Sequence, residues 1–382
     1  MVKNVRAWIL SNCRFAATDR AVTASIVVLK KDDDSDFKVL IARRKADPEA
    51  GKWALPGGHI EPNESPDEGA KRELLEETGI HARQLIRISD KIIETESASE
   101  KERLDIVYAT MVTSDTDAVA GSDSAAVRWV PVNDLPELAF DHANAIRTAV
   151  EKLMRQDKQA AKIKNGNNKG ILIAIEGIDG SGKSTLADRL LDWFDDQDYP
   201  ITHTKWNDSD FISDAIKNCK DERCLSPMLF CLLHAADFVW RYDNVIIPAL
   251  ERNHIVLCDR YFYTSYVRDG IRGTDTEILD KAYKDMREPD VLFHCTLPVE
   301  LAYSRVLAEK GFTFYGSGMD MGLSKNREES CMKYEGLMDK EYKKLLPKQK
   351  NYVKLDTNRS EKEVFKAAKK ELADRFGIGG FE

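Results

Sequence analysis

The chain has 382 residues, of which 42% are hydrophobic and 32% are charged, and its formal net charge is −8 at pH 7. This length exceeds what one ordinary hydrophobic core organises, so two domains are expected. The acidic balance, without a dense run of Lys and Arg, disfavours a nucleic-acid-binding surface. No apolar stretch approaches the roughly 20 residues that span a bilayer, and the seven cysteines form no C-x-x-C pair. We therefore expect a cytoplasmic protein with reduced thiols and no membrane partner.

A composition change divides the chain. Residues 155–169 are polar and end in an Asn/Gly cluster, and residues 171–175 that follow are all apolar. Such a run is typical of a buried parallel strand. We predict an N-terminal domain over residues 1–155, a linker over 156–169 and a C-terminal domain over 170–382.

The N-terminal half begins with strand patterns and then contains one well-marked helix. Ser65 is a suitable helix cap, Pro66 fits the first turn, and Glu68 completes a capping box. Gly79 is a natural left-handed stop for this helix. Strands are predicted before it over residues 23–29 and 38–43, and after it come strands over 84–94, 103–113 and 126–132 and a helix over 141–155.

The helix from Ser65 carries a cluster of acidic residues. Glu73, Glu76 and Glu77 are spaced i, i+3 and i+4, so their carboxylates share one helix face. Three like charges in contact are costly without a cation, and oxygen ligands suit Mg²⁺ or Mn²⁺. The preceding glycine, Gly58, lets the backbone approach these ligands closely, and Arg72 is expected to orient a neighbouring carboxylate. A solvated acidic face is the alternative, but nine specified positions over 23 residues disfavour it: Gly58-x5-Glu64-x7-Arg72-Glu73-Leu74-x-Glu76-Glu77-x-Gly79-Ile80.

This segment resembles the Nudix hydrolase box at every defined position. The resemblance implies an α/β/α sandwich with a mixed sheet, and attack by water on a phosphorus of a nucleoside diphosphate derivative. It also implies that the metal is held by Glu73, Glu76 and Glu77 at the Gly58 loop, with Glu64 and Arg72 in the catalytic set. The flanks over residues 51–58 and 129–142 resemble the ADP-ribose pyrophosphatase branch of the family.

The general base of Nudix enzymes often comes from another loop. Glu100 and Glu102 are candidates for that role here. A polar hairpin loop explains these two residues equally well.

The C-terminal half alternates strand and helix patterns. This succession predicts a parallel sheet with helices on both faces. The predicted elements are a strand over 171–176, a helix from 183, a helix over 226–251, a strand over 255–258, a helix over 275–286, a strand over 291–296, a helix over 298–309, a strand over 351–355 and a helix over 361–375.

A phosphate-binding loop lies between the first of these strands and its helix. The pattern is Gly177-x4-Gly182-Lys183-Ser184. In this context, backbone N–H groups and the helix N-terminus hold ATP phosphates. The lysine reaches the β- and γ-phosphates, and the serine hydroxyl binds Mg²⁺. The predicted ATP-binding set is Gly177, Asp179, Gly180, Ser181, Gly182, Lys183, Ser184 and Thr185.

The segment over residues 176–185 closely resembles the thymidylate kinase P-loop, and residues 255–261, 289–300 and 355–360 resemble further segments of that family. The resemblance implies a kinase that uses ATP and Mg²⁺. Carried over by position, Asp179 would meet the acceptor's sugar, Arg260 its phosphate, and Asp259 would lie near the metal. The loop over 355–360 would contact the adenine, and the analogy makes a homodimer the default expectation.

Two departures from the family concern the acceptor. The family's Phe-x-x-x-Arg, which contacts thymine, aligns with the segment from His234 to Phe238, and its Ala-Tyr-Gln reads Val267-Arg268-Asp269. Either the acceptor pocket holds a different base, or Arg268 replaces the missing arginine.

Residues 311–324 correspond to the lid segment of that family. This segment is rich in Gly and Met and lacks closely spaced arginines. Lys310, Lys325 and Arg327 are the remaining basic candidates for stabilising transition-state charge. Each of them is equally explained as a surface residue.

The sequence thus predicts a bifunctional enzyme of nucleotide metabolism. One half hydrolyses a nucleoside diphosphate derivative, either ADP-ribose-like or a (d)NTP, and the other phosphorylates a (deoxy)nucleoside monophosphate, with dTMP the default acceptor. The hydrolase product could supply the kinase acceptor, or the two halves could serve separate nucleotides. In a third interpretation, the N-terminal half is a ligand-sensing module that regulates the kinase.

Overall fold

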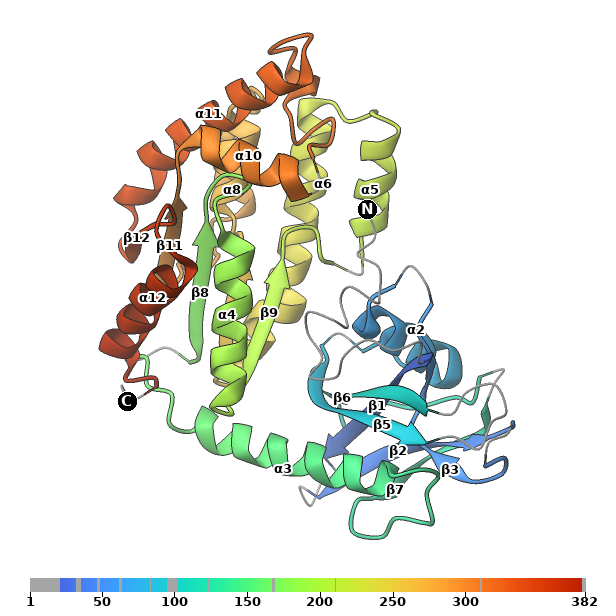
Figure 1. Cartoon of the computed structure of the whole chain (residues 1–382). Helices are drawn as coiled ribbons and strands as arrows, with labels where there is room; N and C mark the ends of the chain where they lie inside the picture. Colours follow the sequence, from blue (N-terminus) through green and yellow to red (C-terminus); the bar gives the residue numbers. More distant parts are fainter. Residues whose placement is uncertain are drawn as a thin grey trace. The chain divides into compact units, whose positions relative to one another are not determined.

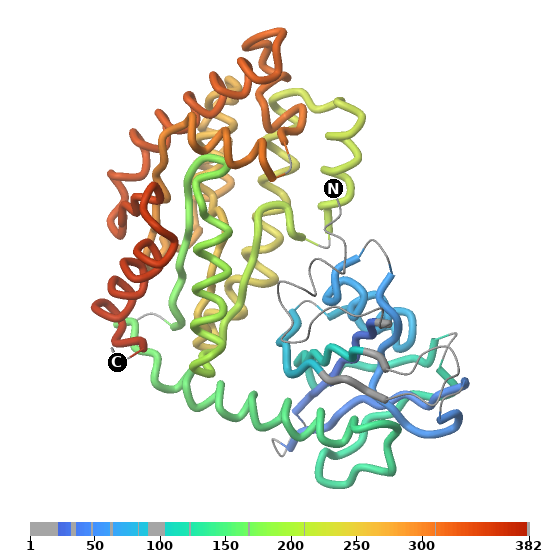
Figure 2. Tube along the Cα trace, in the orientation of Figure 1, coloured from blue at the N-terminus to red at the C-terminus, as the bar shows by residue number. Residues whose placement is uncertain are grey.

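The computed structural model divides into two compact units, Met1–Arg155 and Gln156–Glu382. Figures 1 and 2 follow the chain from blue at the N-terminus to red at the C-terminus. The structure describes residues 21–31, 36–46, 49–61, 64–82, 84–94, 102–121, 124–166, 169–209, 211–309 and 311–379.

The first unit is built on a mixed sheet with β1 (Ala21–Lys31) at its centre. β1 pairs in parallel with β6 (Glu102–Met111) and antiparallel with β2 (Phe37–Arg44). β5 (Ile86–Glu94) extends the sheet beyond β6. The remaining strands are β3 (Trp53–Ala54), β4 (Gly57–His59) and β7 (Ser124–Pro131).

Two helices cover the two faces of this sheet (Figure 1). Alternate residues of a strand point to opposite faces, and β1 is apolar on both. Ile26 packs with Leu74 of α2 (Pro66–Thr78), whereas Val27 packs with Ile146 of α3 (His142–Ala160). The predicted α/β/α sandwich with a mixed sheet is confirmed.

The ends of α2 follow the predicted capping signals. The backbone N–H of Ser65 donates to Glu68 Oε2 at 2.7 Å. Gly79 ends the helix in the left-handed conformation, with φ 70°, and its N–H donates to the Leu75 carbonyl at 2.9 Å. The helix that carries the acidic cluster is therefore fixed at both ends.

The second unit contains five parallel strands in the order β12-β11-β8-β10-β9. The prediction of a parallel sheet is confirmed, although β9 was not predicted. The strands are β8 (Ile171–Glu176), β9 (Ile201–Lys205), β10 (Ile255–Asp259), β11 (Val291–Thr296) and β12 (Tyr352–Asp356).

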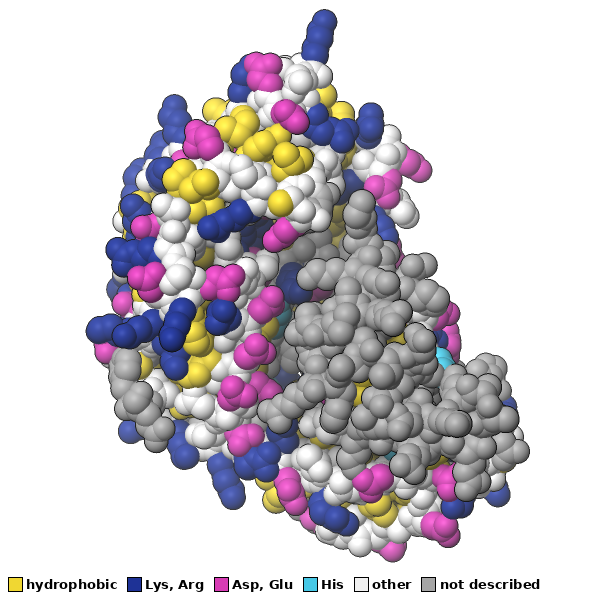
Figure 3. All heavy atoms as spheres, in the orientation of Figure 1, with side chains coloured by type: hydrophobic (Ala, Val, Ile, Leu, Met, Phe, Trp, Pro, Cys, Tyr) yellow, Lys and Arg dark blue, Asp and Glu magenta, His cyan; other side chains and the backbone are white. Residues whose placement is uncertain are grey.

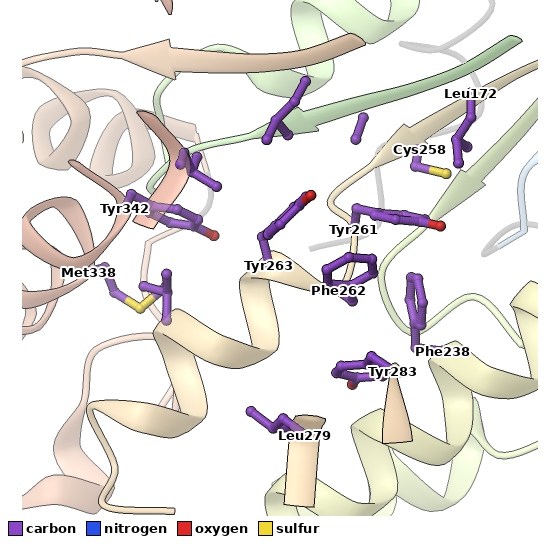
Figure 4. Close-up of a cluster of buried hydrophobic side chains, with 14 of the residues drawn as sticks. Leu172, Phe238, Cys258, Tyr261, Phe262, Tyr263, Leu279, Tyr283, Met338 and Tyr342 are labelled. Atoms are coloured by element: carbon purple, nitrogen blue, oxygen red, sulfur yellow. The ribbon is translucent and has the colours of Figure 1, made fainter. Parts of the chain in front are cut away.

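Helices pack on both faces of the parallel sheet. α4 (Lys183–Asp196) and α12 (Glu361–Phe376) cover one face. An aromatic-rich cluster fills the other face (Figure 4), where the helices are α6 (Pro227–Arg241), α8 (Tyr263–Gly270), α9 (Thr276–Ala282) and α11 (Arg327–Leu345). The remaining helices are α5 (Ser213–Asp221), α7 (Ile247–Glu251) and α10 (Val299–Glu309).

Two helix predictions differ from the structure in their bounds. The helix predicted over 226–251 contains a π-helical turn, Tyr242–Ile246, between α6 and α7. This wider turn lies just before Pro248, which has no N–H to continue the α-helical hydrogen bonds. α3 extends to Ala160, so residues 156–160, which the sequence assigned to a linker, are helical.

The surface carries charges of both signs. On the face of the second unit shown in Figure 3, Lys and Arg side chains are interspersed with Asp and Glu side chains. A search of the described ranges finds no helix with the length and apolarity needed to cross a membrane.

The conformation of Gly79 gives a test of how α2 is held. An alanine at this position should weaken the helix end by about 1 kcal/mol, because a Cβ disfavours the left-handed region. Gly79→Asn should cost less, since Asn tolerates this region. Hydrogen–deuterium exchange of the peptide covering α2 would check this. Equal protection in Gly79→Ala and the unchanged protein would contradict the prediction.

Candidate active sites

In the first unit, one arginine connects three of the predicted site carboxylates. Arg72 donates to both oxygens of Glu64, from Nη2 at 2.7 Å and from Nε at 3.1 Å. Its Nη1 donates to Glu73 Oε1 at 2.9 Å and to Glu76 Oε2 at 3.3 Å. Arg72 thus pairs with its neighbouring carboxylates, and its charge offsets part of their mutual repulsion; its role at the site stays a prediction.

Glu73 is the most constrained of these carboxylates. Burial raises its pKa, and the nearby charges of Glu76 and Glu64 raise it further, while Arg72 acts in the opposite direction. A Cβ on Gly58 would lie 2.5 Å from the Glu73 carboxyl carbon. A side chain at position 58 would therefore displace the Glu73 carboxylate from its place against the loop.

The surroundings of Glu64 and Glu77 differ from those of Glu73. Burial acts to raise the pKa of Glu64, but the hydrogen bonds from Arg72 and from the Glu61 N–H outweigh it, and the pKa is lowered. Glu77 accepts the N–H of Gly57 at 3.0 Å, so Glu77, like Glu73, lies against the loop around β4.

These residues fit a divalent cation in their chemistry. All the side-chain donors are carboxylate oxygens, the type that Mg²⁺ and Mn²⁺ prefer, and Glu73 is a half-buried charge that a cation would stabilise. Within the described part of the chain, no three acidic, His or Cys side chains already converge as a metal cluster. In this structure Arg72 is the common partner of Glu64, Glu73 and Glu76. The predicted ligand set, Gly58, Glu73, Glu76 and Glu77, stays a prediction.

The two candidates for a general base cannot be placed. Glu100 lies outside the described residues. The backbone of Glu102 begins β6, but its side chain also lies outside the described part.

In the second unit, the P-loop runs from β8 directly into α4. Lys183, the first residue of α4, is buried and donates to the Ile178 carbonyl at 2.6 Å. Burial lowers the pKa of Lys183, and Arg260 lowers it further. Ser184 donates its hydroxyl to Asp259 Oδ2 at 2.8 Å. The parallel pairing of β8 with β10 thus brings the predicted Mg²⁺-binding hydroxyl to the carboxylate that ends β10.

Arg260 follows Asp259 in an unusual backbone conformation, with φ 73°. Its guanidinium donates to the Gly177 carbonyl at 3.1 Å and to the Tyr342 hydroxyl at 3.1 Å, and it forms an ion pair with Asp179. An arginine whose backbone is in the left-handed region costs about 1–2 kcal/mol of conformational free energy. These contacts must therefore hold the loop in place. The structure brings Asp179, Asp259 and Arg260 together as the resemblance implied.

A cavity of about 510 Å³ opens over the P-loop. Six of the eight predicted ATP-binding residues line this cavity, and Gly177 and Ser181 do not. It also contains residues that the sequence did not single out, among which Arg305 of α10 donates to the Thr357 carbonyl at 3.3 Å. The residues that line it include Asp179, Lys183, Ser184, Trp206, Asp259, Arg260, Arg305 and Thr357.

The predicted base-recognition residues do not line this cavity. Phe238 is fully buried and packs against Trp206, with ring centroids 5.7 Å apart. Asp269 is fully buried and accepts two hydrogen bonds from Arg268, at 2.7 and 2.9 Å. Their role in acceptor binding stays a prediction, and the aromatic residue that does reach the cavity is Trp206.

His234 is also fully buried. Burial and the charge of Arg268 lower its pKa well below the ordinary value. Its Nδ1 lies 2.6 Å from the Phe230 carbonyl, so Nδ1 carries the proton. Its buried Nε2 is then an acceptor, and no partner for that atom is found among the described residues.

Two of the three predicted lid cations can be placed, and neither lines the cavity. Lys325 and Arg327 are exposed and do not line it, and Lys310 lies outside the described residues. Arg305 was not predicted because it lies in α10, outside the lid segment over residues 311–324. A helix that follows a parallel strand starts at the carboxyl edge of the sheet, and this rule would have pointed to α10.

Another missed residue is Glu335 of α11, which is 2% exposed. Its Oε2 accepts the backbone N–H of Asp179 at 3.3 Å. Burial raises the pKa of Glu335 to about 8, and the neighbouring Asp179 contributes to the rise. The helix that carries Glu335 was not predicted.

Comparisons with known proteins agree with this geometry. Residues 175–368 match the family model described as thymidylate kinase, and residues 19–153 match the one described as NUDIX domain. The chain therefore belongs to the thymidylate kinase family and carries a NUDIX domain ahead of the kinase. Both are enzyme families of nucleotide metabolism that generally use divalent metals, and the kinase family uses ATP. The two resemblances predicted from the motifs are confirmed.

Individual relatives cover mainly the kinase half. The chain is 36% identical over 197 residues to the probable thymidylate kinase 2 of Saccharolobus solfataricus, covering 51% of this chain and 92% of that protein. It is 34% identical over 144 residues to the probable thymidylate kinase of Pyrococcus horikoshii, covering 36% and 70%. Among solved structures, the NUDIX domain of Shewanella oneidensis NrtR complexed with ADP ribose is 27% identical, with a TM-score of 0.32, covering 38% of this chain and 97% of that one.

The raised pKa of Glu335 predicts a pH-dependent stability. The folded value of about 8 exceeds the ordinary value of 4.5, so the folded state keeps a proton that the unfolded state releases between these values. Stability from this group is fully present below about pH 4.5 and is lost as the pH rises through about 8, by up to about 1.4 kcal/mol per pH unit. Glu335→Gln should reduce this loss of stability with rising pH.

Urea midpoints of the nucleotide-free protein between pH 5.5 and 8.5 would measure the effect. Glu341→Gln, which changes a more exposed carboxylate on the same helix, is the matched control. An identical pH slope in Glu335→Gln and the unchanged protein would show that Glu335 does not hold the proton.

Proposed function

We propose that this chain is a bifunctional nucleotide enzyme. Its C-terminal half transfers a phosphoryl group from ATP to a (deoxy)nucleoside monophosphate, with dTMP the default acceptor. Its N-terminal half hydrolyses a nucleoside diphosphate derivative, of the ADP-ribose type or a (d)NTP, with a divalent metal. The observation that carries the proposal is the convergence of Lys183, Ser184, Asp259 and Arg260 in one cavity.

The kinase residues act by positioning and by neutralising charge, which is what phosphoryl transfer requires. Lys183, now bonded to the Ile178 carbonyl, is placed to turn to the donor phosphates. Arg260 would hold the acceptor phosphate. Ser184 and Asp259 would hold Mg²⁺, which supplies charge neutralisation between the donor phosphates when bound. Arg305, beside the loop that contains Thr357, adds positive charge on the donor side.

In the hydrolase half, Glu73, Glu76 and Glu77 would hold the metal. When bound there, the cation would supply polarisation of the diphosphate and a lower pKa of water. Glu64 keeps Arg72 in place through two hydrogen bonds, and Arg72 in turn orients Glu73 and Glu76. The intact carboxylate set supports catalysis over pure ligand sensing.

The ADP-ribose class rests on the flanks of the Nudix box, which resemble that branch in sequence. Around them, the structure holds Trp53 beneath Arg128, with the guanidinium 4.2 Å from the ring centroid. His142 Nδ1 accepts the Leu55 N–H at 2.9 Å, which ties the second flank to the first.

The kinase proposal is tested with a panel of nucleoside monophosphates and Mg-ATP, resolved by anion-exchange chromatography. Glu76→Gln protein would be used so that hydrolysis cannot consume products. Transfer to dTMP above the other acceptors is the expected result. Lys183→Ala in the same background should lower transfer roughly 10²-fold or more, because a donor to the transferring phosphoryl is lost. Transfer to no monophosphate would contradict the proposal.

The hydrolase proposal is tested by cleavage of ADP-ribose and (d)NTPs in Mg²⁺ or Mn²⁺. Glu76→Gln should abolish cleavage, and a chelator should do the same to the unchanged protein, whereas kinase turnover by Glu76→Gln should be preserved. Glu68→Gln, on the same helix but in its cap, is the control and should retain hydrolysis. If Glu76→Gln alters kinase activity while no substrate is cleaved, the N-terminal half is a regulatory sensor.

A further inference from the structure

Helix α11 reaches the phosphate site of the kinase at two points. Glu335 and Tyr342 lie seven residues apart, about two helical turns, and so share one face of the helix. Glu335 is 2% exposed and Tyr342 is fully buried. Figure 4 shows Tyr342 and Met338 beside the segment that contains Tyr261, Phe262 and Tyr263.

Tyr342 contacts the arginine proposed to bind the acceptor phosphate. Its hydroxyl accepts a hydrogen bond from Arg260 Nη1 at 3.1 Å and donates to Glu176 Oε2 at 3.0 Å. A phenolic hydroxyl has one proton and can also accept, so both bonds form together. Tyr342 therefore links Arg260 to a fully buried carboxylate at the end of β8.

Glu176 in turn holds the loop that carries Arg260. It accepts the N–H groups of Tyr261 and Thr264, at 2.9 and 3.1 Å, and the Thr264 hydroxyl at 2.7 Å. With the bond from Tyr342, these contacts surround the carboxylate with donors. Glu176 thus holds the residues that follow Arg260, and these contacts help to keep the Arg260 backbone in its left-handed conformation.

The two terminal nitrogens of Arg260 have different surroundings. Nη1 donates to neutral oxygens, those of Gly177 and Tyr342. Nη2 is bonded to the Asp179 carboxylate, and both Asp179 and Arg260 line the cavity. Nη1 therefore anchors the guanidinium, and an incoming phosphate would compete with Asp179 for Nη2.

Glu335 holds the other member of this ion pair. It accepts the Asp179 N–H at 3.3 Å, which fixes the P-loop residue whose side chain faces Arg260. Two side chains of one helix thus position both Asp179 and Arg260.

The same helix also holds the Gly- and Met-rich segment over residues 311–324. Ser330 donates its hydroxyl to the Ser317 carbonyl at 2.8 Å. Arg272 bridges the two parts, since it donates to the Tyr334 hydroxyl at 3.0 Å and to Asp320 at 2.8 Å. A shift of this segment would therefore move α11 as well.

We propose that Tyr342 and Glu335 are positioning residues for the kinase acceptor, through which α11 couples the segment over 311–324 to Arg260 and Asp179. Their ligand class is the phosphate monoester of a nucleoside monophosphate. The inference rests on the proposed kinase function and concerns only its acceptor side. It predicts effects on acceptor binding that ATP binding does not share.

Tyr342→Phe tests the first contact, because it removes the hydroxyl and keeps the buried ring. The KM for the acceptor should rise about tenfold, as expected for one lost hydrogen bond to a charged group, while the KM for ATP changes less than twofold. Tyr352→Phe is the matched control. It removes a hydroxyl that lies 3.2 Å from His294 Nδ1, away from Arg260, and should leave both constants unchanged.

A double-mutant cycle with Arg260→Lys identifies the route of the effect. Dissociation constants for dTMP, or for the acceptor found in the panel, would be measured by calorimetry, so that slow variants remain informative. A lysine has no second nitrogen to be anchored, so Tyr342→Phe should weaken binding far less in that background. Additive effects would overturn the coupling through Arg260.

Glu335 is tested by rescue. Glu335→Gln keeps an oxygen that accepts the Asp179 N–H and should bind the acceptor like the unchanged protein, whereas Glu335→Ala should bind it several-fold more weakly. An unchanged acceptor KM in Tyr342→Phe, or equal rises in both KM values, would overturn the inference while the kinase function stands. If the unchanged protein phosphorylates and binds no monophosphate, both fail.

Discussion

Both phosphate sites depend on one constraint. Partly buried charges that are arranged to bind a ligand need a counter-charge while no ligand is bound. In the first unit, carboxylates are gathered for a cation, and Arg72 compensates Glu64, Glu73 and Glu76. In the second unit, an arginine is gathered for a phosphate, and Asp179 compensates Arg260. Partly buried charges left unpaired would be costly. Each ligand therefore has to compete with an internal ion pair, which also fixes the geometry of the site.

The two folds supply this arrangement by different means. In the first unit, a single helix carries Arg72, Glu73 and Glu76, and the close passage of the Gly58 loop completes the site. In the second, the carboxyl edge of the parallel sheet brings the site residues together, because β8 leads into the P-loop and β10 ends at Asp259. The buried carboxylate of Glu176 connects these two strand ends and holds the strained loop at Arg260.

Residues within local motifs could be predicted from the sequence, and residues whose role depends on distant contacts could not. The helix from Ser65 to Gly79 and the strand before the P-loop have short-range signals and were found with nearly correct bounds. β9 was missed because Thr202 and Thr204, though buried, are polar and interrupt the apolar pattern. α11 was missed for a similar reason, as its buried face includes Ser330 and Glu335.

The acceptor side shows the limit most clearly. Alignment with the family motif indicated His234 and Phe238, which are buried and do not line the cavity. Trp206, which lines it, follows the unpredicted β9, and Arg305 reaches the P-loop from a helix more than a hundred residues further along the chain. Neither residue has a local signal, because both are placed by the order of the strands.

The central claim is that one chain carries two working phosphate sites. The most direct test is a ³¹P NMR time course on the unmodified protein with Mg²⁺, ATP, dTMP and ADP-ribose in one tube. The account predicts that dTDP and ADP form together with AMP and ribose 5-phosphate, at the rates seen with each set of substrates alone. Absence of dTDP would contradict the kinase site, and intact ADP-ribose would contradict the ADP-ribose class of the hydrolase substrate.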